Sequence, residues 1–159
     1  PDRRGGLLAV AGGALIGLGI NQGLGLLWFE PRPFMIGVGH TLLVHAPDNS
    51  FPSDHATFIF ALGAGLIATG AARRTGAVVC LYGASVAWAR VFLGVHFPVD
   101  MLASLAVGAV SGGIAVAIRP VVAVTVLPVA DALYEGTVAL LHLPPALIPR
   151  GRGPAGPPG

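Results

Sequence analysis

Three short clusters hold nearly all the side chains of this sequence that could do chemistry. They are Arg32-Pro33-Phe34, then Phe51-Pro52-Ser53-Asp54-His55, and last Arg90, His96 and Asp100. Each cluster lies beside a strongly apolar segment, where charged and titratable groups are costly to keep. Such groups are therefore candidates for function, and the mixture of arginine, histidine and aspartate suits chemistry on an anion.

The third cluster has the spacing of an oriented histidine nucleophile. His96 and Asp100 are four residues apart, so both side chains would lie near one face of a helix that Pro98 opens. A carboxylate that accepts the proton of one imidazole nitrogen leaves a directed lone pair on the other, as a nucleophile needs. The alternative is that Asp100 only stabilises the helix N-terminus, with His96 as an interfacial polar residue.

Arg90 and Arg32 are candidates for binding phosphoryl oxygens, because a planar guanidinium donates forked hydrogen bonds to phosphate. Arg90 precedes His96 by six residues, and prolines on both sides of Arg32 restrict the backbone there. The alternatives are a snorkelling Arg90 and an ordinary membrane-edge Arg32.

The second cluster predicts a helix start that could bind an anion. Ser53 is the expected N-cap, with Asp54 and His55 in the first helical turn. A helix N-terminus offers free backbone N–H groups to an anion, and His55 could protonate a leaving oxygen there. The alternative is a plain cap in which Asp54 satisfies the helix dipole.

Four further polar residues precede this cluster, and we expect them to be solvated loop residues. They are His40, His45, Asp48 and Asn49. Histidines and aspartates together are also typical of metal sites. The two arginines would repel a cation, however, so we expect neither a metal nor a cofactor.

The composition is that of a membrane protein. Of the 159 residues, 54% are hydrophobic and 10% charged, and the mean hydropathy is +0.79. A soluble domain carries roughly 25% charged residues. The 24 glycines suit close helix packing in lipid. The formal charge of +2 gives no argument for a nucleic-acid partner, and we expect none.

Apolar runs predict an all-α integral-membrane helical bundle with about four transmembrane helices in this chain. The expected segments are 6–29, 55–72, 75–89 and 98–118. A signal peptide is the competing explanation of the first run, which is nevertheless long enough to span a bilayer. Because the chain starts at Pro1 rather than Met, we expect an earlier membrane helix to be missing.

We expect residues 1–120 to form the catalytic domain, with Arg119-Pro120 closing the last spanning helix. Residues 121–143 carry a proline and several polar side chains, which favours an interfacial or broken helix. Residues 144–159 are rich in proline and glycine, which is typical of a disordered tail.

Arginines indicate how the chain is oriented. If the four segments alternate in direction, Arg3-Arg4, Arg73-Arg74 and Arg119 fall on one face, which the positive-inside rule makes cytoplasmic. The loops 30–54 and 90–100 then share the outer face. All three chemical clusters therefore converge on one side of the membrane.

In order and spacing, the clusters resemble the signature of the type 2 phosphatidic acid phosphatase superfamily. The matching residues are Arg32-Pro33, Pro52-Ser53-Asp54-His55, and Arg90, His96 and Asp100. The loop 45–55 looks like the bacitracin-resistance branch, whose members are undecaprenyl-diphosphate phosphatases. The resemblance implies an enzyme in the bacterial cytoplasmic membrane that hydrolyses a polyprenyl diphosphate lipid at the outer face without a metal.

The resemblance also implies a role for each matching residue. His96 would be the nucleophile that forms a phosphohistidine, Asp100 would orient it, and His55 would be the general acid for the leaving group. The residues implied to bind the substrate are Arg32, Arg90, Ser53 and Asp54.

The sequence departs from the superfamily pattern at three positions. Gly25 stands where the first motif usually has lysine, Asp54 where the second often has glycine, and Ala89 where the third usually has serine. Alternative functions are broader lipid-phosphate hydrolysis, phosphoryl transfer to an acceptor other than water, and non-catalytic binding of a lipid diphosphate.

Overall fold

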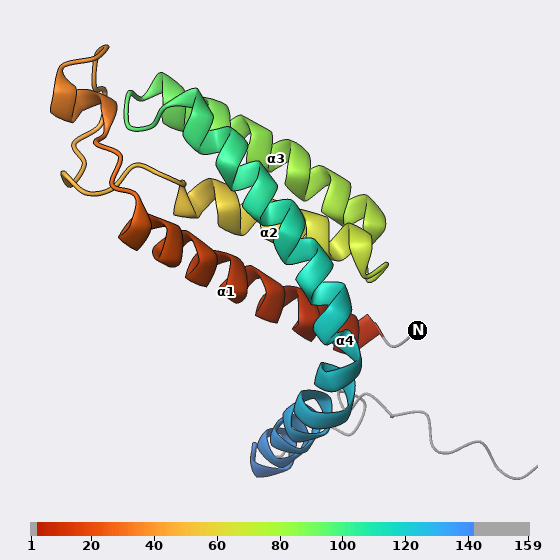
Figure 1. Ribbon diagram of the computed structural model, residues 1–159. Helices are drawn as coiled ribbons and strands as arrows, with labels where there is room; N and C mark the ends of the chain where they lie inside the picture. The colour runs from red at the N-terminus through yellow and green to blue at the C-terminus, as the bar shows by residue number, and fades with distance from the viewer. Residues whose placement is uncertain (1–2, 142–159) are drawn as a thin grey trace, which may run out of the picture.

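The computed structural model describes residues 3–141 as a bundle of helices, with one long connection between the first two helices (Figure 1). The elements are α1 (Arg3–Leu27), the 3₁₀-helix η1 (Pro33–Ile36), α2 (Asp54–Ala68), α3 (Arg73–Phe92) and α4 (Pro98–Leu140). Within these residues, β-structure is limited to one isolated bridge between Pro31 and Asn49. The predicted all-α fold is therefore confirmed. The predicted tail, 144–159, lies outside the described residues.

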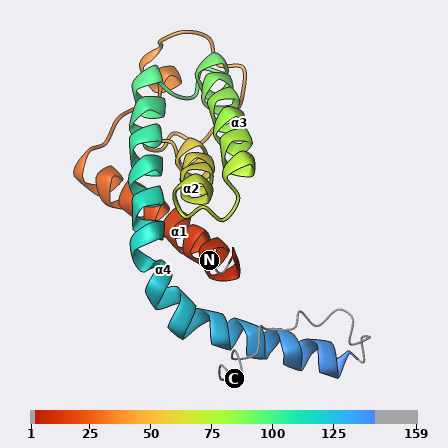
Figure 2. The same ribbon diagram turned by 90° about the vertical axis from the view of Figure 1, so that its right-hand side faces the viewer.

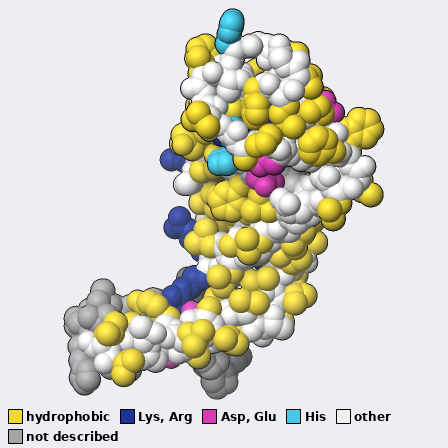
Figure 3. Space-filling model, turned by 90° about the vertical axis from the view of Figure 1, so that its left-hand side faces the viewer, with side chains coloured by type: hydrophobic (Ala, Val, Ile, Leu, Met, Phe, Trp, Pro, Cys, Tyr) yellow, Lys and Arg dark blue, Asp and Glu magenta, His cyan; other side chains and the backbone are white. Residues whose placement is uncertain are grey.

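Three of the helices, α1, α3 and α4, are long and apolar enough to cross a membrane. Helix α2 is apolar but shorter, and it ends at Ala68 rather than at the predicted residue 72. The reason is local: Thr69 caps the last turn, and Gly70 adopts a φ of 71°, which turns the chain out of the helix. Apolar side chains cover much of the surface in Figure 3, as a membrane protein requires.

Helix α4 continues well beyond the predicted boundary at Arg119-Pro120. It reaches Leu140 with Pro120 and Pro128 inside it, so the prediction that the helix closes at Pro120 is wrong. A proline removes one backbone hydrogen bond and bends a helix, while the residues on either side can keep their own bonds. Figure 2 shows the result, with the C-terminal half of α4 turned away from the bundle.

Small residues allow the helices to approach closely. A Cβ atom on Gly76 of α3 would lie 2.7 Å from the carbonyl oxygen of Gly63 in α2, so only glycine fits at that crossing. Phe60 of α2 packs in a small core with Ala56, Ala87 and Met101, which come from α2, α3 and α4. Helix α2 thus lies at the centre and contacts each of the other three helices.

The alternating directions of the helices bring the chemical clusters to one end of the bundle. The end of α1, the start of α2, the end of α3 and the start of α4 meet there, together with the connections 28–53 and 93–97. At the other end Arg119 donates a hydrogen bond to the carbonyl oxygen of Thr69 (3.0 Å), beside the turn before α3.

Candidate active site

A cavity of about 370 Å³ opens at the end of the bundle where the three clusters meet. Its lining includes the predicted residues Arg32, Asp54, His55, Arg90 and His96. The other lining residues come from the end of α1 and from the connection before α2; they are Asn21, Gln22, Gly25, Leu26, His45, Asp48, Asn49, Phe51 and Pro52.

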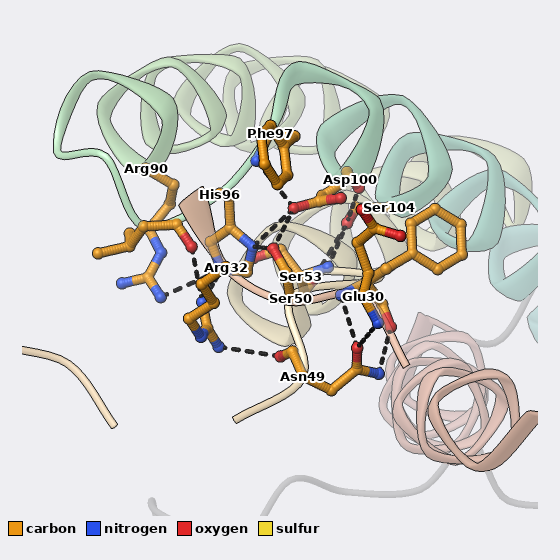
Figure 4. A network of polar contacts seen from close by, with 12 residues as sticks. Glu30, Arg32, Asn49, Ser50, Ser53, Arg90, His96, Phe97, Asp100 and Ser104 are labelled. Atoms are coloured by element: carbon orange, nitrogen blue, oxygen red, sulfur yellow. Dashed lines mark hydrogen bonds and ion pairs between the residues drawn. The ribbon is translucent and has the colours of Figure 1, made fainter. Parts of the chain in front are cut away.

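His96 lies in the short connection between α3 and α4, with its side chain almost fully buried (Figure 4). Its Nδ1 atom is 3.2 Å from Oδ2 of Asp100, which lies one helical turn further along, in the first turn of α4. The same carboxylate oxygen accepts a hydrogen bond of 2.9 Å from the backbone N–H of Phe97. The predicted juxtaposition of His96 and Asp100 at a helix start is therefore present.

The other ring nitrogen of His96 faces two guanidinium groups. Its Nε2 atom is 3.1 Å from Nη1 of Arg32 and 3.3 Å from Nη2 of Arg90. A guanidinium can only donate hydrogen bonds, and an ionised carboxylate can only accept them. The ring proton therefore belongs on Nδ1, beside Asp100, and the lone pair belongs on Nε2, which points toward the arginines.

Burial lowers the pKa of His96 below its ordinary value, and the positive charges of Arg32 and Arg90 lower it further. The hydrogen bond that the ring donates to Asp100 acts in the opposite direction but does not outweigh them. The imidazole is therefore neutral at neutral pH, and Nε2 is free to act as a nucleophile or to accept a hydrogen bond.

Arg32 is held by contacts on each part of its guanidinium. Nη1 donates to the carbonyl oxygen of Val95 (2.8 Å), Nε to Oδ1 of Asp48 (2.7 Å) and Nη2 to the carbonyl oxygen of Asn49 (3.1 Å). Burial raises the pKa of Asp48, but its hydrogen bond and ion pair with Arg32 lower the pKa by more. The guanidinium next to His96 is thus fixed in place before any ligand arrives.

Arg90, at the end of α3, contacts the loop before α2 through His45. Its Nη2 atom lies 3.3 Å from Nε2 of His45. The expectation that His45, Asp48 and Asn49 are only solvated loop residues is incomplete: the Asp48 side chain is 59% exposed, yet all three residues contact one of the arginines and line the cavity. These contacts could not be inferred from the sequence, since nothing local says which side of a long loop folds inward.

Ser53 occupies the predicted N-cap position of α2, but its hydroxyl makes no capping hydrogen bond. The residue is fully buried, and its backbone N–H donates to Oγ of Ser104 in α4 (3.0 Å). Among the described residues its own Oγ has no hydrogen-bond partner. Ser53 therefore lies behind the cavity wall rather than on it.

Asp54 and His55 begin α2 and both line the cavity. The two carboxylate oxygens of Asp54 accept hydrogen bonds from side-chain amides of α1, at 2.9 Å from Asn21 and 3.1 Å from Gln22. Asp54 thus ties the start of α2 to α1, immediately before His55.

Gly25, the position of the missing lysine, also lines the cavity. A Cβ atom there would lie 2.8 Å from Nδ2 of Asn49. That amide is held in place, since it donates to the carbonyl oxygen of Phe51 (2.8 Å) and its oxygen accepts from the N–H of Glu30 (2.8 Å). The Asn49 side chain therefore takes the space that a side chain at position 25 would need.

Two buried serines of this network did not stand out in the sequence. Ser50 contacts both His96 and Asp100, and Ser104 donates to the backbone carbonyl oxygen of Asp100 (2.7 Å). The only signal for Ser104 is its spacing of four residues from Asp100, on the same helix face. Within residues 3–141 no three His, Cys, Asp or Glu side chains gather as metal ligands would.

Comparison with known proteins agrees with the motifs. The chain is 40% identical to Undecaprenyl-diphosphatase BcrC of Bacillus subtilis over 98 residues. The aligned region covers 62% of this chain and 50% of that protein. It is 35% identical over 102 residues to Putative undecaprenyl-diphosphatase YbjG of Escherichia coli, covering 64% and 51%. The chain thus spans about half the length of these curated relatives.

A third relative is the Bacitracin transport permease protein BcrC of Bacillus licheniformis, 34% identical over 70 residues, or 44% of this chain and 34% of that protein. No solved structure matches the chain. Residues 6–122 match the PAP2 superfamily, which includes all three chemical clusters and most of the described helices. The chain therefore belongs to the PAP2 superfamily, as its motifs predicted.

Proposed function

We propose that this protein hydrolyses undecaprenyl diphosphate to undecaprenyl phosphate and inorganic phosphate. The observation that carries the proposal is the lone pair of His96 Nε2, which faces both guanidinium groups inside one cavity. A nucleophile surrounded by phosphate-binding groups suits phosphoryl transfer, which depends mainly on positioning and charge stabilisation. The names of the two longer-matching relatives support the choice of lipid.

In the first step, Nε2 of His96 attacks the terminal phosphorus of the diphosphate. An N–P bond forms while the bond from phosphorus to the bridging oxygen breaks. The bridging oxygen leaves with the lipid phosphate and takes a proton from His55, which lines the same cavity. Asp100 accepts the Nδ1 hydrogen bond throughout and stabilises the positive charge that the ring acquires.

In the second step, water attacks the phosphohistidine. His55, now neutral, takes a proton from the water as its oxygen bonds to phosphorus. The N–P bond breaks, the lone pair returns to Nε2 of His96, and inorganic phosphate is released. No metal is needed for either step, because arginines supply the positive charge.

Arg32 and Arg90 bind the equatorial oxygens of the transferred phosphoryl group in this proposal. Nε of Arg90 is buried, and among the described residues it has no hydrogen-bond partner. A buried donor without a partner costs about 1–3 kcal/mol, which a phosphoryl oxygen would offset. Asp54, which lines the cavity, helps to select the substrate, whereas Ser53 acts from behind the wall, where its backbone hydrogen bond to Ser104 supports the start of α2.

We further propose that residues 1–120 form the catalytic unit and that the cavity opens at the outer face of the bacterial cytoplasmic membrane. The arginines at positions 3, 4, 73 and 74 lie at the other ends of their helices, and Arg119, inside α4, bonds to Thr69 at that same end of the bundle, which supports a cytoplasmic position for that end. A lipid diphosphate could then keep its prenyl chain in the bilayer while its headgroup enters the cavity.

The decisive experiment measures phosphate release from undecaprenyl diphosphate by the purified protein in detergent, with excess chelator present. We expect release by the wild type and by His40→Ala, which changes an exposed histidine outside this cavity. We expect none from His96→Ala, and a phosphohistidine at residue 96 during turnover of the wild type.

Each of the other outcomes would count against one part of this proposal. Release that survives His96→Ala would remove the proposed mechanism, and loss of release in chelator alone would indicate a metal. Equal kcat/KM for lipid monophosphates would indicate a broader phosphatase, and transfer of phosphate to an added alcohol would indicate a phosphotransferase. Binding of the lipid without turnover by the wild type would indicate a non-catalytic binder.

A further inference from the structure

We propose that Ser50 is a positioning residue that locks the His96–Asp100 pair in its reactive arrangement. This inference rests on the proposed function, because it concerns the nucleophile of that reaction. Ser50 lies at the end of the loop before α2, and Figure 4 shows it between the imidazole and the carboxylate.

The position of Ser50 is tightly determined. The residue is fully buried, and its backbone N–H donates to the carbonyl oxygen of Glu30 at 2.8 Å. Its hydroxyl donates a hydrogen bond to Oδ2 of Asp100, and its Oγ lies 3.2 Å from Nδ1 of His96. Ser50 does not line the cavity, so it can act on the substrate only through its neighbours.

The hydroxyl proton of Ser50 can be donated only to the carboxylate of Asp100. Nδ1 of His96 carries a proton of its own, so the hydroxyl proton belongs with the Asp100 carboxylate. Oγ is then left to accept from Nδ1–H alongside that carboxylate. The serine therefore favours a proton on Nδ1, which leaves the lone pair of the neutral imidazole on Nε2.

Asp100 depends on this contact for its orientation. Its Oδ2 atom receives the hydrogen bonds from Ser50, His96 and Phe97 N–H, whereas its Oδ1 is buried and has no partner among the described residues. Without the serine, the carboxylate would lose one of three donors, and the ring would lose one of two acceptors. We therefore expect a less ordered nucleophile, with substrate binding by the arginines unchanged.

Three variants separate hydrogen bonding from packing. Ser50→Ala removes the hydroxyl, and Ser50→Cys keeps its shape but donates only weakly. Both should lower kcat by about 10- to 100-fold with KM changed less than about 3-fold. The matched control is Ser111→Ala, another fully buried serine, which bonds to the carbonyl oxygen of Val107 within α4 and should keep kcat within about 2-fold.

A second measurement does not depend on catalysis. NMR of imidazole-labelled protein, with His96 assigned from His96→Gln, can follow titration of the ring. We expect Ser50→Ala to raise the pKa of His96, because Asp100 would no longer share its negative charge with the hydroxyl. The charged and titratable groups that share the cavity with the ring are the same in both proteins; they are Arg32, Arg90, His45, His55, Asp48 and Asp54.

These results distinguish failure of the inference from failure of the proposed function. If the wild type releases no phosphate but Ser50→Ala still shifts the titration of His96, the positioning role stands and the enzymatic function falls. Wild-type kcat in Ser50→Cys would show that the residue only fills space. An unchanged titration in Ser50→Ala, with thermal unfolding unaffected, would overturn the inference directly.

Discussion

Nη1 of Arg32 lies 3.1 Å from Nε2 of His96, although 64 residues separate the two in the chain. Each residue belongs to a connection between helices rather than to a spanning helix. The contact holds because the guanidinium also bonds to the carbonyl oxygen of Val95, immediately before His96. The arginine is therefore tied directly to the connection that carries the histidine.

We predict that Arg32→Lys lowers kcat/KM by about 100-fold or more. A lysine ammonium cannot reproduce the planar set of contacts to Val95, Asp48 and Asn49 while also facing His96. Steady-state phosphate release measures the effect. Arg73→Lys, at the opposite end of the bundle, is the control and should keep wild-type activity, so equal activities of the two variants would contradict the role of Arg32.

We predict that the acid limb of the kcat/KM profile lies below about pH 6.5, the ordinary value for a free histidine. Burial and the two arginines lower the pKa of His96, so the neutral nucleophile persists at neutral pH and is lost only as pH falls through that lowered pKa. Asp100→Asn removes the partner that raises the pKa and should move the limb to still lower pH. A limb above neutrality would be inconsistent with His96 as nucleophile.

We predict unequal effects of removing the two amides that hold Asp54. Asn21 is 3% exposed and bonds to both Asp54 and Thr57, so Asn21→Ala should cost about 1–3 kcal/mol of the free energy of unfolding. Gln22 is exposed, and Gln22→Ala should cost less than about 0.5 kcal/mol. Thermal unfolding in detergent should show a lower midpoint for the first variant alone.

We predict that Gly94→Ala disrupts the connection that carries His96. Gly94 has a φ of 72°, and a Cβ atom there would collide with the carbonyl oxygen of His40. The expected cost is about 1–3 kcal/mol of stability, with reduced activity. Gly113→Ala is the control, because a Cβ atom at that position in α4 meets nothing within 4 Å. A thermal unfolding midpoint for Gly94→Ala as high as that of Gly113→Ala would show that a side chain at position 94 causes no strain.

The sequence alone determined the residue types at the site and the family to which the chain belongs. Chemical groups and short spacings are local properties, so the spacing of four residues was enough to pair His96 with Asp100 across one helical turn. Apolar run lengths likewise predicted a helical membrane bundle, and alternation of the runs put the clusters at one end.

Only the tertiary structure decided which loop residues complete the site. Asp48 and His45 look like solvated loop residues in sequence, yet each contacts an arginine of the cavity, and Ser50 reaches the buried carboxylate. Pro120 is typical of a helix end, yet α4 continues through it. These outcomes depend on packing between segments far apart in the chain, and local sequence cannot encode which distant backbone or side chain will satisfy a polar group.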